Sequence, residues 1–197
     1  MIHINTTPVY GDHPIFEFKV DDLPSDSFFI SEINWDRGLK RNSFSSKKQT
    51  NNVENVTKNL LNFFNKESIT KVLTQLYEKN YDLFSYEYPL KSKYSLYEYI
   101  YNITRPVSDI NLDLDGFNLS KHFDNRLIFG NFFLNLIDNQ SSTKFYDYLN
   151  KDLFIYEAPK KKGEGVFFLN TIKTFHSVNV NSDRYILSNT ICLNIND

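Results

Sequence analysis

Hydrophobic and polar residues alternate over residues 14–20, which read PIFEFKV. Alternation with a period of two is typical of a half-buried strand, because successive side chains of a strand point to opposite faces. A second apolar run, SFFISEI at 27–33, follows a turn at Pro24 and Ser25. We therefore expect the chain to begin with two strands.

Helical spacing replaces this alternation over residues 53–80. Apolar residues recur there at intervals of three and four, which places them on one face of a helix. The polar stretch NKES at 65–68 predicts a short break, so we expect two amphipathic helices packed against a sheet. A third helix is predicted from Ser95 to Ile103, with Pro106 stopping it.

Residues 36–52, between the predicted strands and helices, are polar and basic. We interpret them as an exposed, mobile loop, and the alternative is a flap that faces a substrate. The basic residues are Arg37, Lys40, Arg41, Lys47 and Lys48.

Short apolar runs separated by polar turns fill the chain from about residue 109 onward. Seven or eight such runs favour a sandwich or barrel-like β domain. A length of 197 residues suits one domain, and no linker divides the chain. We expect a single domain over 1–197, with N-terminal strands and packing helices in 1–108 and the β core in 109–197.

Composition limits the classes of partner and compartment. The net charge of −2 gives no signal for nucleic acid or for a membrane surface. No apolar run comes near the roughly 20 residues that cross a bilayer, and the N-terminus does not look like a signal peptide. The lone Cys192 allows no internal disulfide, so we expect a cytoplasmic protein.

Two histidines and one aspartate form the candidate chemical site. His122 and Asp124 stand two residues apart in KHFDN, a spacing that puts both side chains on one face of a strand. His176 follows in another strand-like run, TFHSV. Two imidazoles and one carboxylate with open positions suit non-haem Fe(II) oxygenases. Catalytic zinc sites use similar ligands, so these residues alone leave the metal open.

Arg184 strengthens the oxygenase interpretation. It stands in the run DRYILSNTICLN, eight residues after His176, and the strand residues that follow it are uncharged. A buried guanidinium can pair with a carboxylate through two parallel hydrogen bonds. The alternative is a surface salt bridge or a polar strand end.

The C-terminal part, roughly residues 109–197, resembles the Fe(II)- and 2-oxoglutarate-dependent dioxygenase superfamily, in particular its prolyl-hydroxylase-like branch. The similar stretches occur in the family's order: KHFDNR, RLIFGNFFLNLID, SSTKFYD, APKKKGEGVFFLNTIKTFHSV and SDRYILSNTICLN. The resemblance implies a double-stranded β-helix, also called a jelly-roll or cupin-like core, with helices packed on its larger sheet.

The same resemblance implies the residue roles. His122, Asp124 and His176 correspond to the iron ligands, and Arg184 to the base that binds the distal carboxylate of 2-oxoglutarate. Asn131 and Asn135 are candidate contacts to the C1 carboxylate of that co-substrate. The sequence departs from the family pattern at two places: Ser141 and Ser142 replace a common Gly-Gly pair, and Phe129 or Phe133 replaces a Thr or Tyr that faces the co-substrate.

We therefore expect an Fe(II)- and 2-oxoglutarate-dependent dioxygenase that uses O2 to hydroxylate a peptide or a small molecule and releases succinate and CO2. One alternative is a non-catalytic β-helix module that binds a metal or a ligand. Another is a zinc hydrolase with the same three ligands.

Overall fold

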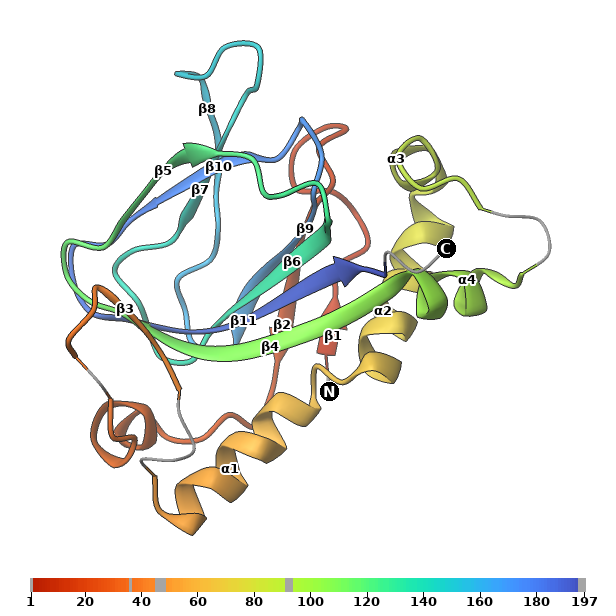
Figure 1. Cartoon of the computed structure of the whole chain (residues 1–197). Helices are drawn as coiled ribbons and strands as arrows, with labels where there is room; N and C mark the ends of the chain where they lie inside the picture. The colour runs from red at the N-terminus through yellow and green to blue at the C-terminus, as the bar shows by residue number, and fades with distance from the viewer. Residues whose placement is uncertain (1, 36, 45–48, 91–93, 195–197) are drawn as a thin grey trace.

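Two antiparallel β-sheets face each other in the computed structural model, which describes residues 2–35, 37–44, 49–90 and 94–194 (Figure 1). The larger sheet has the strand order β1 (Ile2–Ile4), β2 (Ile15–Val20), β9 (Glu164–Leu169), β6 (Ile128–Asn135), β11 (Arg184–Leu193), β4 (Thr104–Asp113) and β3 (Arg41–Ser43). The smaller sheet has the order β5 (Asn118–His122), β10 (Phe175–Asn179), β7 (Thr143–Tyr146) and β8 (Phe154–Glu157).

The chain passes back and forth between these sheets from β4 to β11. Strands β4, β6, β9 and β11 belong to the larger sheet, and β5, β7, β8 and β10 belong to the smaller one. The only two consecutive strands of this set that share a sheet are β7 and β8, which pair with each other, and eight strands divided between two antiparallel sheets in this way form a jelly-roll. The predicted double-stranded β-helix, mainly β with flanking helices, is therefore confirmed.

Four helices connect the N-terminal strands to this core in the described part of the chain: α1 (Asn51–Asn62), α2 (Lys66–Lys79), α3 (Tyr81–Ser85) and α4 (Leu96–Ile103). The side chains of Thr50, Asn65 and Ser95 cap the first, second and fourth of them by accepting a backbone N–H bond. The predicted pair of helices is confirmed, as is the third predicted helix, but the break lies at 63–65 rather than at 65–68, because α2 already begins at Lys66.

None of the helices among the described residues combines the length and the apolar character that crossing a bilayer takes.

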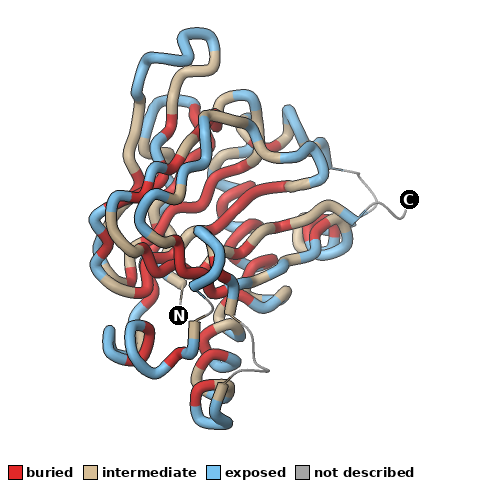
Figure 2. The backbone as a smooth tube through the Cα atoms, turned by 60° about the vertical axis from the view of Figure 1, so that its left-hand side comes forward, coloured by how far each residue is buried: buried red, intermediate tan, exposed pale blue. Residues whose placement is uncertain are grey.

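Helices α1 and α2 cover the outer face of the larger sheet, and buried residues follow its strands (Figures 1 and 2). Phe132 of β6 lies at the centre of this contact, with its ring centroid 4.4 Å from that of Phe167 and 6.0 Å from that of Phe64. Burial of large aromatic rings is the main stabilising term for such a layer. This packing fixes the larger sheet against the helices.

The prediction of a second strand over SFFISEI, residues 27–33, is wrong. The structure forms a π-helix, η1 (Phe28–Glu32), in which the Ile33 N–H donates to the Phe28 carbonyl. Phe28 and Phe29 are both buried, so two adjacent rings face the core. A strand would point adjacent side chains to opposite faces, whereas a helical turn buries both.

The predicted loop at 36–52 is also corrected in part; residues 36 and 45–48 of it lie outside the described residues. Arg41–Ser43 form β3 and pair with β4, and α1 already begins at Asn51. Arg37 donates to the Asp183 carboxylate across 3.0 Å. Basic side chains there meet acidic partners on the sheet, which sequence periodicity does not reveal.

Strand β4 begins at Thr104, five residues before the predicted start of the β core, and it contains Pro106. In the described chain, β3 pairs only with residues 111–113 of β4, so Pro106 has one partner strand, β11. Proline lacks a backbone N–H and is tolerated at such an edge. Helix α4 therefore ends before Pro106, at Ile103.

We predict that Phe132→Ala lowers the free energy of unfolding by about 3–5 kcal/mol, because it removes a fully buried ring from between sheet and helix. Chemical denaturation measures this loss. Leu149→Ala is the control, since Leu149 is 80% exposed, and it should change stability by less than about 0.5 kcal/mol. Equal effects of the two substitutions would contradict the prediction.

Candidate metal centre and carboxylate pocket

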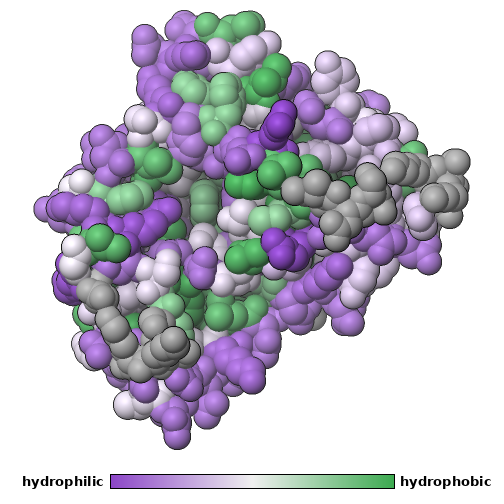
Figure 3. Space-filling view, viewed as in Figure 1, coloured by the Kyte–Doolittle hydropathy of each residue, from purple (hydrophilic) through white to green (hydrophobic). Residues whose placement is uncertain are grey.

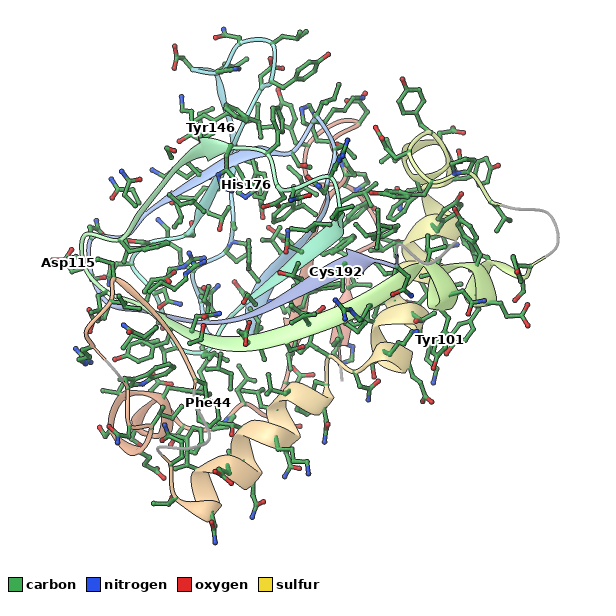
Figure 4. All side chains as sticks on the ribbon, in the orientation of Figure 1. Phe44, Tyr101, Asp115, Tyr146, His176 and Cys192 are labelled. Atoms are coloured by element: carbon green, nitrogen blue, oxygen red, sulfur yellow. The ribbon has the colours of Figure 1, made fainter. Side chains whose placement is uncertain are left out.

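His122 and His176 lie directly opposite each other on two neighbouring strands of the smaller sheet. They are Cα partners in the antiparallel pairing of β5 and β10, and their ring centroids are 4.4 Å apart. Figure 4 shows His176 beside Tyr146 on the smaller sheet, while Cys192 lies on β11 of the larger one. Cross-strand neighbours share one face, so both imidazoles project from the same side.

Backbone carbonyls determine which imidazole nitrogen is free. His122 Nδ1 lies 2.8 Å from the Ser120 carbonyl oxygen, and His176 Nδ1 lies 2.8 Å from the Thr174 carbonyl oxygen. A carbonyl can only accept, so each Nδ1 carries the hydrogen and each Nε2 presents a lone pair. This is the arrangement that orients metal-binding histidines.

Asp124 completes the group. One of its carboxylate oxygens lies 3.6 Å from His122 Nε2, and the other lies 3.9 Å from His176 Nε2. Asn131 Nδ2 donates to Asp124 Oδ2 across 2.8 Å. The amide therefore orients the carboxylate from the larger sheet while leaving its other lone pairs available.

These three residues fit a divalent metal. One ligand atom from each lies within 4.8 Å of the others. Metal–ligand bonds of about 2.1 Å would place neighbouring octahedral ligands roughly 3 Å apart, so small side-chain rotations close the set around an ion. Two neutral imidazoles and one carboxylate, with an exposed side, match the ligands of non-haem iron.

The environment of His176 favours its neutral, ligating form. Its side chain is buried against the rings of Phe145 and Phe168, with centroid distances of 5.8 and 4.8 Å. Burial lowers the pKa of His176, and the nearby Asp124 carboxylate opposes that shift only in part. A neutral imidazole at neutral pH is the form that binds a metal.

Arg184 has a buried guanidinium whose contacts with its polar neighbours are long. Its Nη1 lies 3.6 Å from Asp113 Oδ2, and its Nη2 lies 3.4 Å from Thr143 Oγ1. Within the described part of the chain, its buried Nε reaches no acceptor. Burial lowers the pKa of Arg184 to about 10, so the group is still charged at neutral pH. A buried cation with unfilled donors is costly and suits an anionic ligand.

One small cavity joins this guanidinium to the metal centre. His176 and Arg184 both line it, together with Arg41, Phe133, Thr143 and three aliphatic side chains. Its volume is about 20 Å³, which is room for a water molecule. A five-carbon diacid therefore requires the lining side chains to move aside. In Figure 3, apolar and weakly polar residues occupy the centre of the face over the two sheets, with hydrophilic residues around them.

The remaining predicted residues have different surroundings. Asn131 contacts the Asp124 carboxylate. The Asn135 amide donates to the carbonyls of Pro159 and Glu164 and accepts from Asn139, so the structure gives it a role in holding loops. Nothing in these surroundings supports a contact between Asn135 and a co-substrate.

The two candidate phenylalanines are now distinguished. Phe133 lines the cavity beside Arg184, whereas Phe129 packs on Tyr88, with ring centroids 4.4 Å apart, on the helix side of the sheet. They stand four residues apart on β6, and the register shift between Ile191 and Cys192 of the paired β11 shows the strand to be irregular near its start. Phe133 therefore takes the position that faces the cavity.

Sequence reasoning missed Arg41, Asp113 and Thr143. Arg41 was placed in a loop, and Thr143 carries no distinctive signal. Asp113 did carry one, because it is a charged residue within the strand-like run INLDLD, and it is fully buried. A buried carboxylate in a strand implies a basic partner.

Comparison with known proteins adds a likeness of fold. Neither a protein-family model nor a curated protein matches the sequence. A Shewanella oneidensis protein provisionally named an oxygenase aligns over 92% of this chain and 82% of its own, with a TM-score of 0.54 and 11% identity. SnoN, an α-ketoglutarate-dependent non-haem epimerase of nogalamycin biosynthesis, aligns over 91% of this chain and 78% of its own, with a TM-score of 0.51 and 12% identity.

A prolyl-4-hydroxylase of Pseudomonas putida aligns over 91% of this chain and 92% of its own, with a TM-score of 0.48 and 13% identity. At such low identities, the likeness to the Shewanella oneidensis protein and to SnoN shows only that these chains share a fold. That fold is the one that the sequence resemblance implied.

We predict that Asn131→Ala weakens binding of Mn(II) by roughly 10- to 100-fold, because the carboxylate of Asp124 loses the amide that orients it. Calorimetric titration of the protein with Mn(II) measures the change. Asn5→Ala is the matched control, since Asn5 is exposed and follows the edge strand β1. An Asn131→Ala variant that binds Mn(II) as tightly as the wild type does would show that the amide does not support the metal-binding carboxylate.

Proposed function

We propose that this protein is an Fe(II)- and 2-oxoglutarate-dependent oxygenase that hydroxylates a peptide or small-molecule substrate. The observation that carries the proposal is that His176, of the three-residue candidate metal centre, and the buried cation Arg184 line one cavity together. A ligand that binds a metal at one end and carries a carboxylate at the other matches this pair of features, and 2-oxoglutarate is such a ligand.

His122, Asp124 and His176 would hold the metal in this proposal. When bound, Fe(II) supplies the redox chemistry by which O2 oxidises 2-oxoglutarate to succinate and CO2 and hydroxylates a C–H bond of the substrate. The chain contributes two imidazoles whose tautomer is fixed by carbonyls and a carboxylate oriented by Asn131. These contacts preorganise the ligands before the ion arrives.

Arg184 would bind the distal carboxylate, and Thr143 would add a hydroxyl beside it. Both side chains are buried, so water competes little with the ion pair there. Phe133 forms part of the wall between Arg184 and the metal centre and offers no polar group. The anchoring of the distal carboxylate thus depends mainly on the guanidinium.

Aromatic and basic side chains adjacent in sequence to the proposed ligands lie on the outer face of the smaller sheet. Phe123, between two of the proposed ligands, is 40% exposed and packs on Phe175 with ring centroids 4.8 Å apart. Lys121 lies over the ring of Tyr146, with its Nζ 4.3 Å from the centroid. Phe175 and Tyr146 are cross-strand partners, and they alternate along their strands with His176 and its partner Phe145, so these groups lie on the face of the smaller sheet that points away from the proposed metal ligands.

We expect anaerobic addition of Fe(II) and 2-oxoglutarate to the wild type to give a weak visible charge-transfer band, and aerobic incubation to give succinate. His176→Ala removes one nitrogen ligand and should abolish the band. His3→Ala is the control, because His3 is exposed and lies on the edge strand β1. A wild type that gives neither band nor succinate but hydrolyses esters with Zn(II) would instead favour the zinc hydrolase.

We predict that Arg184→Gln weakens 2-oxoglutarate binding at least about tenfold, since one charge-assisted hydrogen bond contributes roughly 1.5–3 kcal/mol. The affinity for Mn(II) should stay near that of the wild type. Calorimetric titration of the Mn(II)-loaded protein measures both constants. The exposed Arg105 supplies the control Arg105→Gln. Unchanged co-substrate affinity in Arg184→Gln would remove Arg184 from the proposed site.

A further inference from the structure

Three charged side chains meet at the ends of three adjacent strands, β3, β4 and β11. Asp113 of β4 is the Cα partner of Arg41 on one side and of Arg184 on the other. Directly paired residues place their side chains on the same face of a sheet. The register therefore puts one carboxylate between two guanidinium groups.

The carboxylate of Asp113 is shared unequally. Arg41 donates to it twice, from Nε to Oδ1 across 2.5 Å and from Nη2 to Oδ2 across 2.8 Å. Arg184 lies farther from this carboxylate, with 3.6 Å between its Nη1 and Asp113 Oδ2. Bidentate pairing at short distance is the stronger interaction, so Asp113 is committed to Arg41.

Burial makes this unequal sharing significant. The side chains of Asp113 and Arg184 are 0% and 3% exposed, and that of Arg41 is 36% exposed. Two guanidinium groups and one carboxylate leave one positive charge beside the cavity. The stacking of Arg41 on Phe117, with its Cζ 4.5 Å from the ring centroid, helps to hold Arg41 on the carboxylate.

Loss of Arg41 would change the partner of Asp113. A fully buried carboxylate without its bidentate partner is strongly destabilised, and Arg184 is the nearest remaining cation. Arg184 would then close the 3.6 Å gap and pair with Asp113, and its charge would no longer be available to a ligand in the cavity.

We propose that Arg41 is a positioning residue for the cavity lined by His176 and Arg184. By binding Asp113, Arg41 keeps Arg184 free to pair with the distal carboxylate of a diacid. The inference rests on the proposed function for the identity of that diacid, 2-oxoglutarate. It also assigns a role to the N-terminal segment, because β3 lies outside the eight strands of the jelly-roll.

The test is a double-mutant cycle on Mn(II)-loaded protein, with calorimetric titration of 2-oxoglutarate. Arg41→Gln should weaken 2-oxoglutarate binding at least about tenfold, the equivalent of one charge-assisted contact, and leave Mn(II) affinity within about twofold. Asp113→Asn should tighten 2-oxoglutarate binding, because the competing carboxylate is gone. The double variant Arg41→Gln/Asp113→Asn should match Asp113→Asn within about threefold.

The matched control is Arg37→Gln, because Arg37 belongs to the same segment and pairs with Asp183 at the surface. It should bind 2-oxoglutarate as the wild type does. Thermal unfolding of each variant separates loss of fold from loss of affinity. If Arg41→Gln does not fold, the comparison of Asp113→Asn with the double variant decides alone, since neither keeps a buried carboxylate at position 113.

Two outcomes overturn the inference. If a folded Arg41→Gln variant binds 2-oxoglutarate as tightly as the wild type does, Asp113 does not capture Arg184. A double variant at least about tenfold weaker than Asp113→Asn would show that Arg41 contacts the ligand itself. Both differ from failure of the proposed function, in which the Mn(II)-loaded wild type binds no 2-oxoglutarate and both proposals fall.

Discussion

The antiparallel pairing of β5 with β10 is the constraint on which the rest of the site depends. It sets His122 opposite His176, and the carbonyls of Ser120 and Thr174 then turn both rings so that each Nε2 faces the Asp124 carboxylate. A slip of one residue would send one imidazole to the other face of the sheet. The register shift between His176 and Val178 lies next to this pair, so the strand adjusts its course immediately beyond the site.

Buried charge is the second constraint, and it lies on the opposite sheet. Asp113 and Arg184 occupy positions where apolar residues would pack more stably, since a buried ion pair rarely repays its desolvation. Buried charged groups persist where they have a role other than stabilising the fold. A guanidinium held at 3.4–3.6 Å from its neighbours has not been optimised for stability, because shorter contacts would satisfy more of its donors.

Much of this architecture could be predicted from the sequence, and what was missed has definite physical reasons. The spacing of HxD and the strand-like surroundings of His176 indicated the candidate metal centre, and apolar periodicity indicated α1, α2 and the β core. Periodicity failed at 27–33, where two adjacent rings are buried together, and at Arg41, where a basic residue in a polar segment pairs with a carboxylate 72 residues away. Long-range charge pairs leave no local pattern.

The two halves of the site belong to different sheets, which makes the packing between the sheets part of the chemistry. His122 and His176 project from the smaller sheet, whereas Asn131 and Arg184 project from the larger one. Phe168 of the larger sheet connects them, with its ring centroid 5.1 Å from that of Phe145 and 4.8 Å from that of His176. Because close-packed rings resist compression, this contact helps to fix the distance between the two sheets, and with it the separation of the candidate metal centre from the guanidinium.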